Sequence, residues 1–375
     1  MNSSSLPKVT CLIGTRPEAI KMAPVILAVR QCGKVHCEVL LSGQHQAMAA
    51  EALGLFGIHD VVWLETDLAS FSLADQAAAY LEGLGRYLSH TSCAYMLVHG
   101  DTTTGLIGAL AAFYAHVPVG HVEAGLRSGD MQNPFPEEAN RVLIDRLCDH
   151  LFAPTEGAAA NLRQEGCATE RIEVTGNTVV DAVRLIAARA PRACALSDLS
   201  RLPMTDSTEL VLLTAHRREN WGTPLRDICG AARDLIRARE NLWVVMPVHP
   251  NPAVKLIVFE ELGDVEQVIL TDPLDYDSLI ALERDADLIL TDSGGIQEEA
   301  PEFGTPVLVL RETTERPEAV LAGFAQVIGR KPEDIVSAAV KALDAGRLTG
   351  GTNPFGDGKA AERICARVLH ALKIT

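Results

Sequence analysis

Short apolar runs alternate along the chain with longer segments whose apolar residues recur at helical spacing. Helical spacing is clear, for example, over residues 17–30 and 136–148. Continuous apolar strands separated by helices are typical of a parallel sheet covered on both faces. The pattern predicts an α/β, Rossmann-like domain over residues 1–177. Its expected strands are VTCLIGT, CEVLLSG, YMLVHGD, HVPVGHVE, HLFAPT and IEVTGN.

The same pattern restarts after a loose stretch at residues 189–209 and predicts a second Rossmann-like domain over residues 178–357. We place the hinge between Gly176 and Asp181. The last helix, residues 358–375, follows a segment rich in Gly, Pro and Asn, and we expect it to pack back on the first domain. The expected strands of the second domain are VLLTAH, LWVVMPVHP, QVILTDP, DLILTD and PVLVL.

Composition restricts the partners and the compartment. At 375 residues the chain is long enough for two cores, and 47% of it is hydrophobic. The net charge of −16 makes nucleic acid or an anionic membrane an improbable partner. Nine cysteines without zinc-like spacing, and an N-terminus without an apolar signal core, predict a cytoplasmic protein.

Polar residues gather directly after the predicted strands. Because open parallel sheets bind ligands at the carboxyl ends of their strands, we expect two strand-end surfaces and a site in the interdomain cleft. The segments concerned are Gly14-Thr15-Arg16, His99-Gly100-Asp101, His121-Val122-Glu123, His216-Arg217-Arg218, His249-Pro250 and Asp292-Ser293-Gly294-Gly295.

Two of these turns suit an anion. Ser293, Gly294 and Gly295 lie between a strand and a helix, where free N–H groups point outward, and Arg316 can add positive charge. In the first domain, Arg16 and Lys21 lie near the start of the first helix. Either group could be an ordinary turn or a pair of solvated cations, but together in an acidic protein they favour a diphosphate clamp. The chain has neither G-x-G-x-x-G nor a P-loop motif, so a nicotinamide cofactor is unsupported.

Acidic residues crowd the first domain's strand ends. Asp101, Glu123 and Glu137 should repel one another, which would raise at least one carboxyl pKa towards the working pH and allow acid and base catalysis. His216 of the second domain could join them. Glu137 and Glu138 could instead simply cap a helix after Pro136.

Two H-x-[DE] pairs offer a rival hypothesis, a metal site. His99 with Asp101 and His121 with Glu123 carry side chains that ligate divalent ions. Alternate residues of a strand point to opposite faces, however, so the members of each pair need not converge. We therefore predict no metal.

At this point the motifs carry a resemblance to a known family. The chain resembles the non-hydrolysing UDP-N-acetylglucosamine 2-epimerases from about residue 9 to its end, in the family's order and spacing. The motifs are GTRPEAIKMAPV, HGDTTT, HVEAGLRSGD, PFPEEANR, TGNTVVD, TAHRREN, PVHPNP and TDSGGIQEEAPEFGTPVLVLRETTERPEA.

The resemblance implies a glycosyltransferase B-like fold, a homodimer, and no nicotinamide or metal cofactor. It implies an isomerase that interconverts UDP-N-acetylglucosamine (UDP-GlcNAc) and UDP-N-acetylmannosamine by eliminating UDP to form 2-acetamidoglucal and adding it back. The implied catalytic residues are Asp101, Glu123, Glu137 and His216. The implied UDP-sugar contacts are Arg16, Lys21, Asn177, His249, Tyr276, Ser293, Gly294, Gly295, Glu299 and Arg316.

One departure concerns the effector site at which many bacterial members bind a second UDP-GlcNAc. Gln44, His45, Glu138 and Arg217 match that site, but Ala47 replaces a polar residue. No Lys or Arg occurs from Val35 to Gly85. We expect activation to be weak or absent. The alternative functions are a hydrolysing 2-epimerase that releases N-acetylmannosamine and UDP, a glycosyltransferase, and a non-catalytic UDP-sugar sensor.

Overall fold

The computed structural model describes residues 6–43, 46–66, 72–203, 205 and 207–374. Contacts divide the chain into two units. Unit 1 comprises Met1–Leu185 and Phe355–Thr375, and unit 2 comprises Ile186–Pro354. None of the helices in the described ranges is long and apolar enough to cross a membrane.

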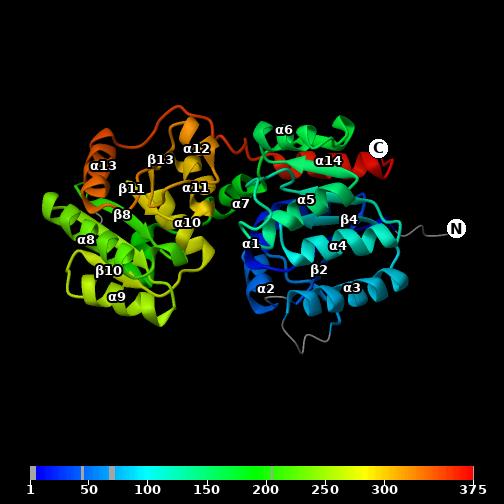
Figure 1. The fold of residues 1–375 in the computed structure, drawn as a ribbon, viewed down its shortest axis with the longest axis horizontal. Coiled ribbons are helices and arrows are strands. Elements are labelled where there is room, and N and C mark those ends of the chain that lie inside the picture. Colours follow the sequence, from blue (N-terminus) through cyan, green and yellow to red (C-terminus); the bar gives the residue numbers. More distant parts are fainter. Residues whose placement is uncertain (1–5, 44–45, 67–71, 204, 206, 375) are drawn as a thin grey trace. The chain divides into compact units, whose positions relative to one another are not determined.

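Unit 1 is a parallel sheet with helices on both faces, as the sequence predicts (Figure 1). Its strand order is β3-β2-β1-β4-β5-β6-β7. Helices α1, α2 and α14 pack together, and α3, α4 and α5 form a second group. The strands are β1 (Lys8–Ile13), β2 (His36–Leu41), β3 (Val62–Trp63), β4 (Cys93–His99), β5 (Val119–Val122), β6 (His150–Ala153) and β7 (Ile172–Val174). The helices are α1 (Arg16–Gln31), α2 (Gln46–Gly54), α3 (Leu73–His90), α4 (Thr103–Tyr114), α5 (Glu137–Leu147), α6 (Glu156–Gln164), α7 (Thr178–Ala187) and α14 (Ala360–Ala371).

Unit 2 is a second parallel sheet, with the strand order β10-β9-β8-β11-β12-β13. Its core is built from the inward faces of the strands and of the long helices α8 and α13. The strands are β8 (Glu209–Thr214), β9 (Leu242–Pro247), β10 (Val268–Thr271), β11 (Leu288–Thr291), β12 (Val307–Val309) and β13 (Ala325–Val327). The helices are α8 (Thr223–Ala238), α9 (Pro252–Leu262), α10 (Tyr276–Asp285), α11 (Gly294–Glu299), α12 (Pro317–Leu321) and α13 (Pro332–Ala345).

The division between the units falls inside α7, whereas the sequence places the boundary after residue 177. The reason is that α7 is tied to the start of α14. The Asp181 carboxylate accepts hydrogen bonds from the N–H groups of Ala360 (3.3 Å) and Ala361 (3.0 Å). The N–H of Asn177 donates to the carbonyl of Phe355 at 2.7 Å. These bonds cap the start of α14 and tie it to α7 within unit 1.

The turn between β1 and α1 requires a glycine and a capping residue. A Cβ on Gly14 would lie 2.2 Å from Oγ1 of Thr104, so only glycine allows the turn to approach α4. Thr15 caps α1 and forms a capping box with Glu18, and Pro17 lies in the first turn. This arrangement fixes the direction in which α1 presents its first side chains.

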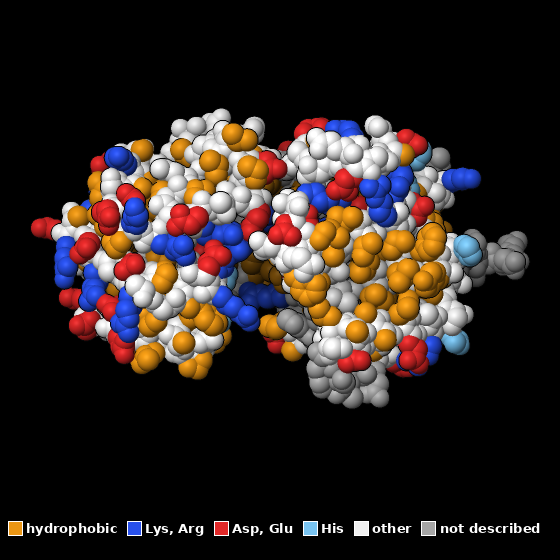
Figure 2. Space-filling view, in the orientation of Figure 1, with side chains coloured by type: hydrophobic (Ala, Val, Ile, Leu, Met, Phe, Trp, Pro, Cys, Tyr) orange, Lys and Arg blue, Asp and Glu red, His pale blue; other side chains and the backbone are white. Residues whose placement is uncertain are grey.

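Unit 1 also has an exposed apolar patch. Phe113 and Tyr114 at the end of α4, and Leu143 on the neighbouring α5, are exposed. Figure 2 shows hydrophobic side chains gathered over the face of unit 1 that carries these helices. A contiguous apolar patch of this kind is typical of an interaction surface.

A buried ionic network holds the charged loop that follows β5. The ring of His121 lies 2.6 Å from the carboxylate of Asp145, which also accepts hydrogen bonds from Arg127 (2.7 Å) and from the N–H of Gly125 (3.2 Å). Arg127 in turn donates to Glu165 at 2.6 Å. Much of the charge in this loop therefore serves to hold its backbone in place.

We expect Asp145→Asn to lower the free energy of unfolding by about 3 kcal/mol, because it removes the buried negative charge that pairs with the Arg127 guanidinium. Burial would raise the pKa of Asp145, but His121 and Arg127 outweigh it and lower this pKa. The stabilisation is therefore present above the unfolded pKa of about 3.9 and is lost as the pH falls through the folded pKa.

Denaturant titrations between pH 7 and pH 3 test this expectation. The gap between wild type and Asp145→Asn should narrow below about pH 4. Glu51→Gln, an exposed change on α2, is the control and should follow wild type throughout. A variant as stable as wild type at pH 7 would contradict the assignment.

Candidate functional site

In unit 1, a buried ion pair lies at the carboxyl end of β5. The ammonium of Lys21 on α1 is 2.6 Å from Oε2 of Glu123, and Nε2 of His99 is 3.3 Å from the same oxygen. Glu123 has a φ of 69°, a left-handed conformation that is uncommon for a residue with a side chain. Such strain is often found at functional sites.

The pKa of Glu123 runs against the sequence-based expectation. Burial would raise this pKa, but the charge of Lys21 and the neighbouring His99 ring outweigh it and hold the pKa well below its usual value. The expectation that crowded acids raise a catalytic carboxyl pKa is therefore wrong for Glu123. The physical reason is that a cation, and not another acid, is its nearest charged neighbour.

Glu18 is a buried carboxyl that the sequence analysis did not single out. It accepts hydrogen bonds from the N–H of Thr15 (2.7 Å) and from the hydroxyl of Thr102 (2.9 Å). It thus ties the β1–α1 turn to the β4–α4 turn. Burial raises the pKa of Glu18, although His99 and the hydrogen bonds oppose the rise. Its position three residues after Thr15 in GTRPE was the available signal, because it is the capping-box spacing.

Asp101 and Glu138 are joined through Arg141. The guanidinium of Arg141 is 2.6 Å from the carboxylate of Asp101 and 3.0 Å from that of Glu138. Glu138 also accepts from the N–H groups of Ser128 (2.9 Å) and Gly129 (3.0 Å). Burial would raise the pKa of Glu138, but these bonds and Arg141 outweigh it and lower the pKa. Glu138 therefore fastens the loop after β5 to α5.

Glu137 differs from its neighbour. It is the first residue of α5 and is partly buried, and no hydrogen bond or ion pair links its carboxylate to another described residue. Unlike Glu138, it is not committed to the fold. Its carboxylate is therefore available for a ligand.

The two H-x-[DE] pairs do not converge. His99 faces Glu123, whereas His121 lies between Asp145 and the carbonyl of Gly100. Within the described ranges, no group of three or more His, Cys, Asp and Glu side chains is placed to hold a metal ion.

In unit 2, the strand ends are organised around the buried carboxylate of Asp292. It accepts hydrogen bonds from the N–H groups of His216 and Arg217, both at 2.9 Å, and from Asn220 at 2.8 Å. The ring of His216 is 3.1 Å from the other carboxylate oxygen and is 45% exposed. Asp292 thereby fixes the turn after β8 and leaves the ring of His216 open to a ligand.

Two guanidinium groups lie beside the turn that opens α11. A Cβ on Gly294 would be 3.8 Å from Nη2 of both Arg217 and Arg316. The first N–H groups of α11, from Gly294 onward, have no helical carbonyl to bind. Backbone donors and two arginines at one glycine-lined turn make a suitable site for a phosphate group.

Each arginine is held by a glutamate. Arg316 forms an ion pair with Glu298, and Nη2 of Arg217 is 3.6 Å from Glu315. Hydrogen bonds from Arg311 are the main reason that the pKa of Glu315 falls to about 2, with Arg217 contributing. The carboxylates orient the guanidinium groups towards Gly294.

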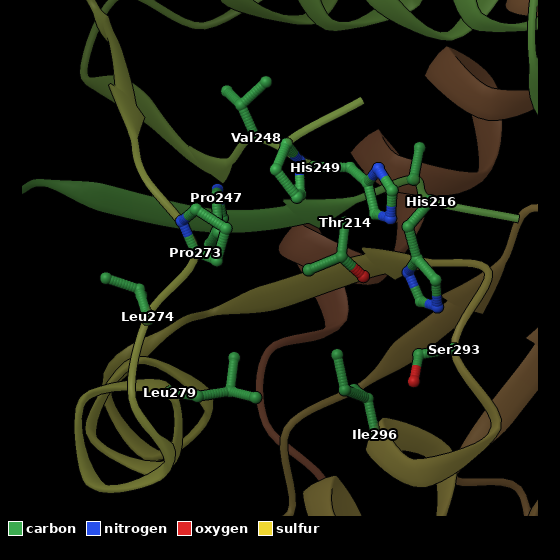
Figure 3. A pocket seen from close by; sticks show the side chains of 12 residues that line it. Thr214, His216, Pro247, Val248, His249, Pro273, Leu274, Leu279, Ser293 and Ile296 are labelled. Carbon is green, nitrogen blue, oxygen red and sulfur yellow. The ribbon is translucent and has the colours of Figure 1, made fainter. Parts of the chain in front are cut away.

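A pocket of about 210 Å³ lies next to this turn in unit 2 (Figure 3). Its walls are largely apolar, with Val248, Leu279 and Ile296 among them, while His216 and Ser293 lie at one side. Apolar walls with polar groups on one side suit a flat base attached to a polar chain. The lining residues are Thr214, Ala215, His216, Pro247, Val248, His249, Pro250, Pro273, Leu274, Leu279, Ser293 and Ile296.

His249 lines the same pocket in a defined tautomer. Its Nδ1 accepts a hydrogen bond from the N–H of Asn251 at 3.2 Å. A neutral imidazole whose Nδ1 accepts must carry its proton on Nε2. His249 can therefore donate a hydrogen bond to a ligand oxygen.

Three other residues implied by the family resemblance are buried, namely Tyr276, Glu299 and Asn177, whereas Arg16 is partly buried. The hydroxyl of Tyr276 donates to Glu299 at 2.9 Å, so Tyr276 supports this carboxylate from behind. The side-chain oxygen of Asn177 caps α7 by accepting from Val179 at 3.0 Å. Arg16 is the first residue of α1. Of the predicted effector residues, Glu138 and Arg217 are placed above, and Gln44 and His45 lie outside the described residues.

Comparisons with known proteins agree on one family. Residues 27–369 match the family model described as UDP-N-acetylglucosamine 2-epimerase. The UDP-N-acetylglucosamine 2-epimerase of Salmonella typhimurium is 44% identical over 373 residues, which are 98% of each chain.

Solved structures give the same result. The UDP-GlcNAc 2-epimerase from Neisseria meningitidis, bound to UDP-GlcNAc, is 37% identical with a TM-score of 0.85, and the match covers 97% of this chain and 100% of that one. The enzyme from Methanocaldococcus jannaschii, in complex with UDP-GlcNAc and UDP, is 34% identical with a TM-score of 0.78, and the match covers 97% and 99%. The chain belongs to the UDP-N-acetylglucosamine 2-epimerase family.

Proposed function

We propose that this epimerase interconverts UDP-GlcNAc and UDP-N-acetylmannosamine without hydrolysing them, by eliminating UDP and adding it back through 2-acetamidoglucal. The observation that carries the proposal is that the two strand-end surfaces offer different groups to a ligand. Unit 2 offers arginines and backbone donors, whereas unit 1 offers carboxylates. The reaction needs both kinds of group, because a diphosphate must be bound while a sugar exchanges a proton.

Unit 2 is proposed to hold the nucleotide. The phosphates bind at Ser293, Gly294 and Gly295 with Arg217 and Arg316, and the base enters the apolar pocket beside His249. Glu299, which Tyr276 supports, accepts hydrogen bonds from the ribose hydroxyls. His216 lies where the pocket meets the phosphate turn, so it can act on the leaving group.

Unit 1 is proposed to act on the sugar. A C2 proton next to an acetal is a very weak acid, so the departing diphosphate must be stabilised before this proton can be removed. Carboxylates near C1 stabilise the cationic character that then builds up. We assign proton transfer and this stabilisation to Asp101, Glu123 and Glu137, without assigning a face of the sugar to each.

Lys21 is proposed to link phosphate binding to proton transfer on the sugar. It pairs with Glu123 at 2.6 Å, and Arg16 lies on the same first turns of α1. A substrate phosphate would compete with Glu123 for the ammonium group. As the ammonium turns towards the phosphate, the pKa of Glu123 should rise, because burial would no longer be opposed by the nearest charge. Substrate binding would then activate the base.

Assembly and location complete the proposal. We propose a homodimer in which the exposed patch of Phe113, Tyr114 and Leu143 packs against a second copy, because apolar side chains of this size gain from burial. We also propose a cytoplasmic enzyme, since all nine cysteines are free.

Proton NMR in deuterated water tests the reaction. With UDP-GlcNAc as substrate, we expect UDP-N-acetylmannosamine to form with deuterium at C2, because the proton is exchanged during each turnover. Free N-acetylmannosamine and UDP as sole products would indicate a hydrolysing 2-epimerase. Transfer to an added acceptor would indicate a glycosyltransferase, and binding without turnover a sensor.

Two variants should separate the tasks of the units. We expect Glu123→Gln to lower kcat by about 10²- to 10⁴-fold while UDP still binds, since the carboxylate acts on the sugar. Arg316→Lys keeps a cation beside the buried Glu298 but cannot form bidentate hydrogen bonds with a phosphate. We therefore expect KM to rise about tenfold with a smaller change in kcat. Steady-state kinetics and calorimetric titration with UDP measure both effects.

Exposed residues of each unit provide the controls for this pair. Glu51→Gln in unit 1 and Arg237→Lys in unit 2 should leave both constants unchanged. If Glu123→Gln and Arg316→Lys changed kcat and KM alike, the division of labour between the units would be wrong.

Activation by a second UDP-GlcNAc should be weak or absent. The chain has no Lys or Arg from Val35 to Gly85, and Glu138 is already bound to the backbone of Ser128 and Gly129 and to Arg141. We expect a hyperbolic rate curve with UDP-N-acetylmannosamine, unchanged by traces of UDP-GlcNAc. A sigmoidal curve that becomes hyperbolic on such addition would overturn the expectation.

A further inference from the structure

One face of α10 carries two buried polar side chains towards Glu299. Tyr276 and Glu283 are seven residues apart, which is two helical turns, so they lie on the same side of the helix. The hydroxyl of Tyr276 donates to Oε1 of Glu299 at 2.9 Å. Glu283 is fully buried, and neither of its carboxyl oxygens receives a hydrogen bond from any described residue.

A fully buried carboxylate without donors is very unfavourable, and a neutral acid is far less so. Glu299, its neighbour, is another acid. Burial and the charge of Glu299 raise the pKa of Glu283 well above its usual value. A hydrogen bond between the two carboxyl groups can form only if one of them keeps its proton.

Among the described residues, no Lys or Arg forms an ion pair with Glu283. Beyond Tyr276 and Glu299, the nearby titratable group is Glu298, whose partner is Arg316. The other titratable groups on the elements packed against α10 are Cys194, Glu302 and Glu209, of which Glu209 is bound by Arg239. A proton on Glu283 is the simplest way to satisfy both carboxyl groups.

We propose that Glu283 stays protonated in the folded protein and donates a hydrogen bond to Glu299, acting as a positioning residue for nucleotide binding. This inference rests on the proposed function in one respect, the contact between Glu299 and the ribose. Tyr276 donates to the Glu299 carboxylate, and on this proposal Glu283 donates to it as well, so the two side chains fix its position. Glu283 itself touches no substrate.

The retained proton can be tested without any ligand. The pKa of Glu283 is raised on folding, so its stabilising effect is complete below the unfolded pKa of about 4.3 and is lost as the pH rises through the folded pKa. Glu283→Gln keeps a donor and has no proton to lose. Its folding constant relative to wild type should therefore rise about tenfold per pH unit above about pH 5.

Denaturant titrations at pH 5, 6, 7 and 8 measure this ratio. In a Trp63→Phe background, fluorescence reports only Trp221 and Trp243, which belong to unit 2. Glu240→Gln, an exposed change in the same unit, is the control and should show no slope. Parallel profiles for wild type and Glu283→Gln would overturn the retained proton.

Calorimetric titrations test the positioning role. Glu283→Met fills a similar volume without a donor, so it should weaken UDP binding about tenfold, whereas Glu283→Gln should stay within about twofold of wild type. The same variants should bind 2′,3′-dideoxyuridine diphosphate as wild type does, because Glu299 acts through the ribose hydroxyls. A split of this kind would not follow from general damage to the fold.

The outcomes are distinguishable. Unchanged UDP affinity in Glu283→Met, or an equal loss for both nucleotides, would overturn the positioning role. If wild type failed to bind UDP, the proposed function would fail, and the pH titrations would still decide whether Glu283 keeps its proton.

Discussion

The contact between Lys21 and Glu123 is the interaction on which the unit 1 site depends. Both side chains are nearly buried, at 13% and 10% exposure, so neither charge can rely on water. An unpaired carboxylate at this depth would take up a proton or disrupt the fold. The turn that begins α1 places Lys21 correctly: Gly14 allows the close approach to α4, and Glu18 ties that turn to β4–α4. Glu123 also has a left-handed backbone conformation, with a φ of 69°.

In unit 2 the crowded charges are positive, and carboxylates pair with them. Arg217 and Arg316 crowd around Gly294, and glutamates separate and orient them. A guanidinium has five N–H donors and each glutamate engages only part of them, so an anion at this turn can bind the arginines as well. A diphosphate there would add charge-assisted hydrogen bonds without first breaking the ion pairs. The site is thus organised before the ligand arrives.

The sequence predicted the fold well because the fold follows from periodicity. Strands such as β1 and β11 are continuous apolar runs that end in polar residues, and their positions follow directly. The sequence analysis did not predict two edge strands, β3 and β13. β3 is only Val62–Trp63 and is exposed, and β13, Ala325–Val327, contains a glutamine, so neither forms an apolar run.

The sequence indicated which polar residues follow the strands, but it did not indicate how they pair. Glu123 stood out because it ends a strand, yet its partner Lys21 is 102 residues away in the sequence, and only the fold brings them together. The same holds for His121, which could equally have been a ligand and is instead part of the network with Asp145. Glu283 gave no signal, because a glutamate in a helix is normally exposed.

The ion pair between Lys21 and Glu123 also raises the question of why an enzyme would hold the pKa of its catalytic base so low. A carboxylate whose pKa is held far below neutrality is a poor base, and each unit of pKa corresponds to about 1.4 kcal/mol of differential stabilisation. If Glu123 were always in this state, catalysis would lose that energy. On the proposed mechanism the loss is temporary, because the phosphate that draws Lys21 away arrives with the substrate. The cation then stabilises the leaving group, and Glu123, still buried, becomes basic when a C2 proton is present to be removed. The resting ion pair would thereby protect the empty site from holding an unpaired charge.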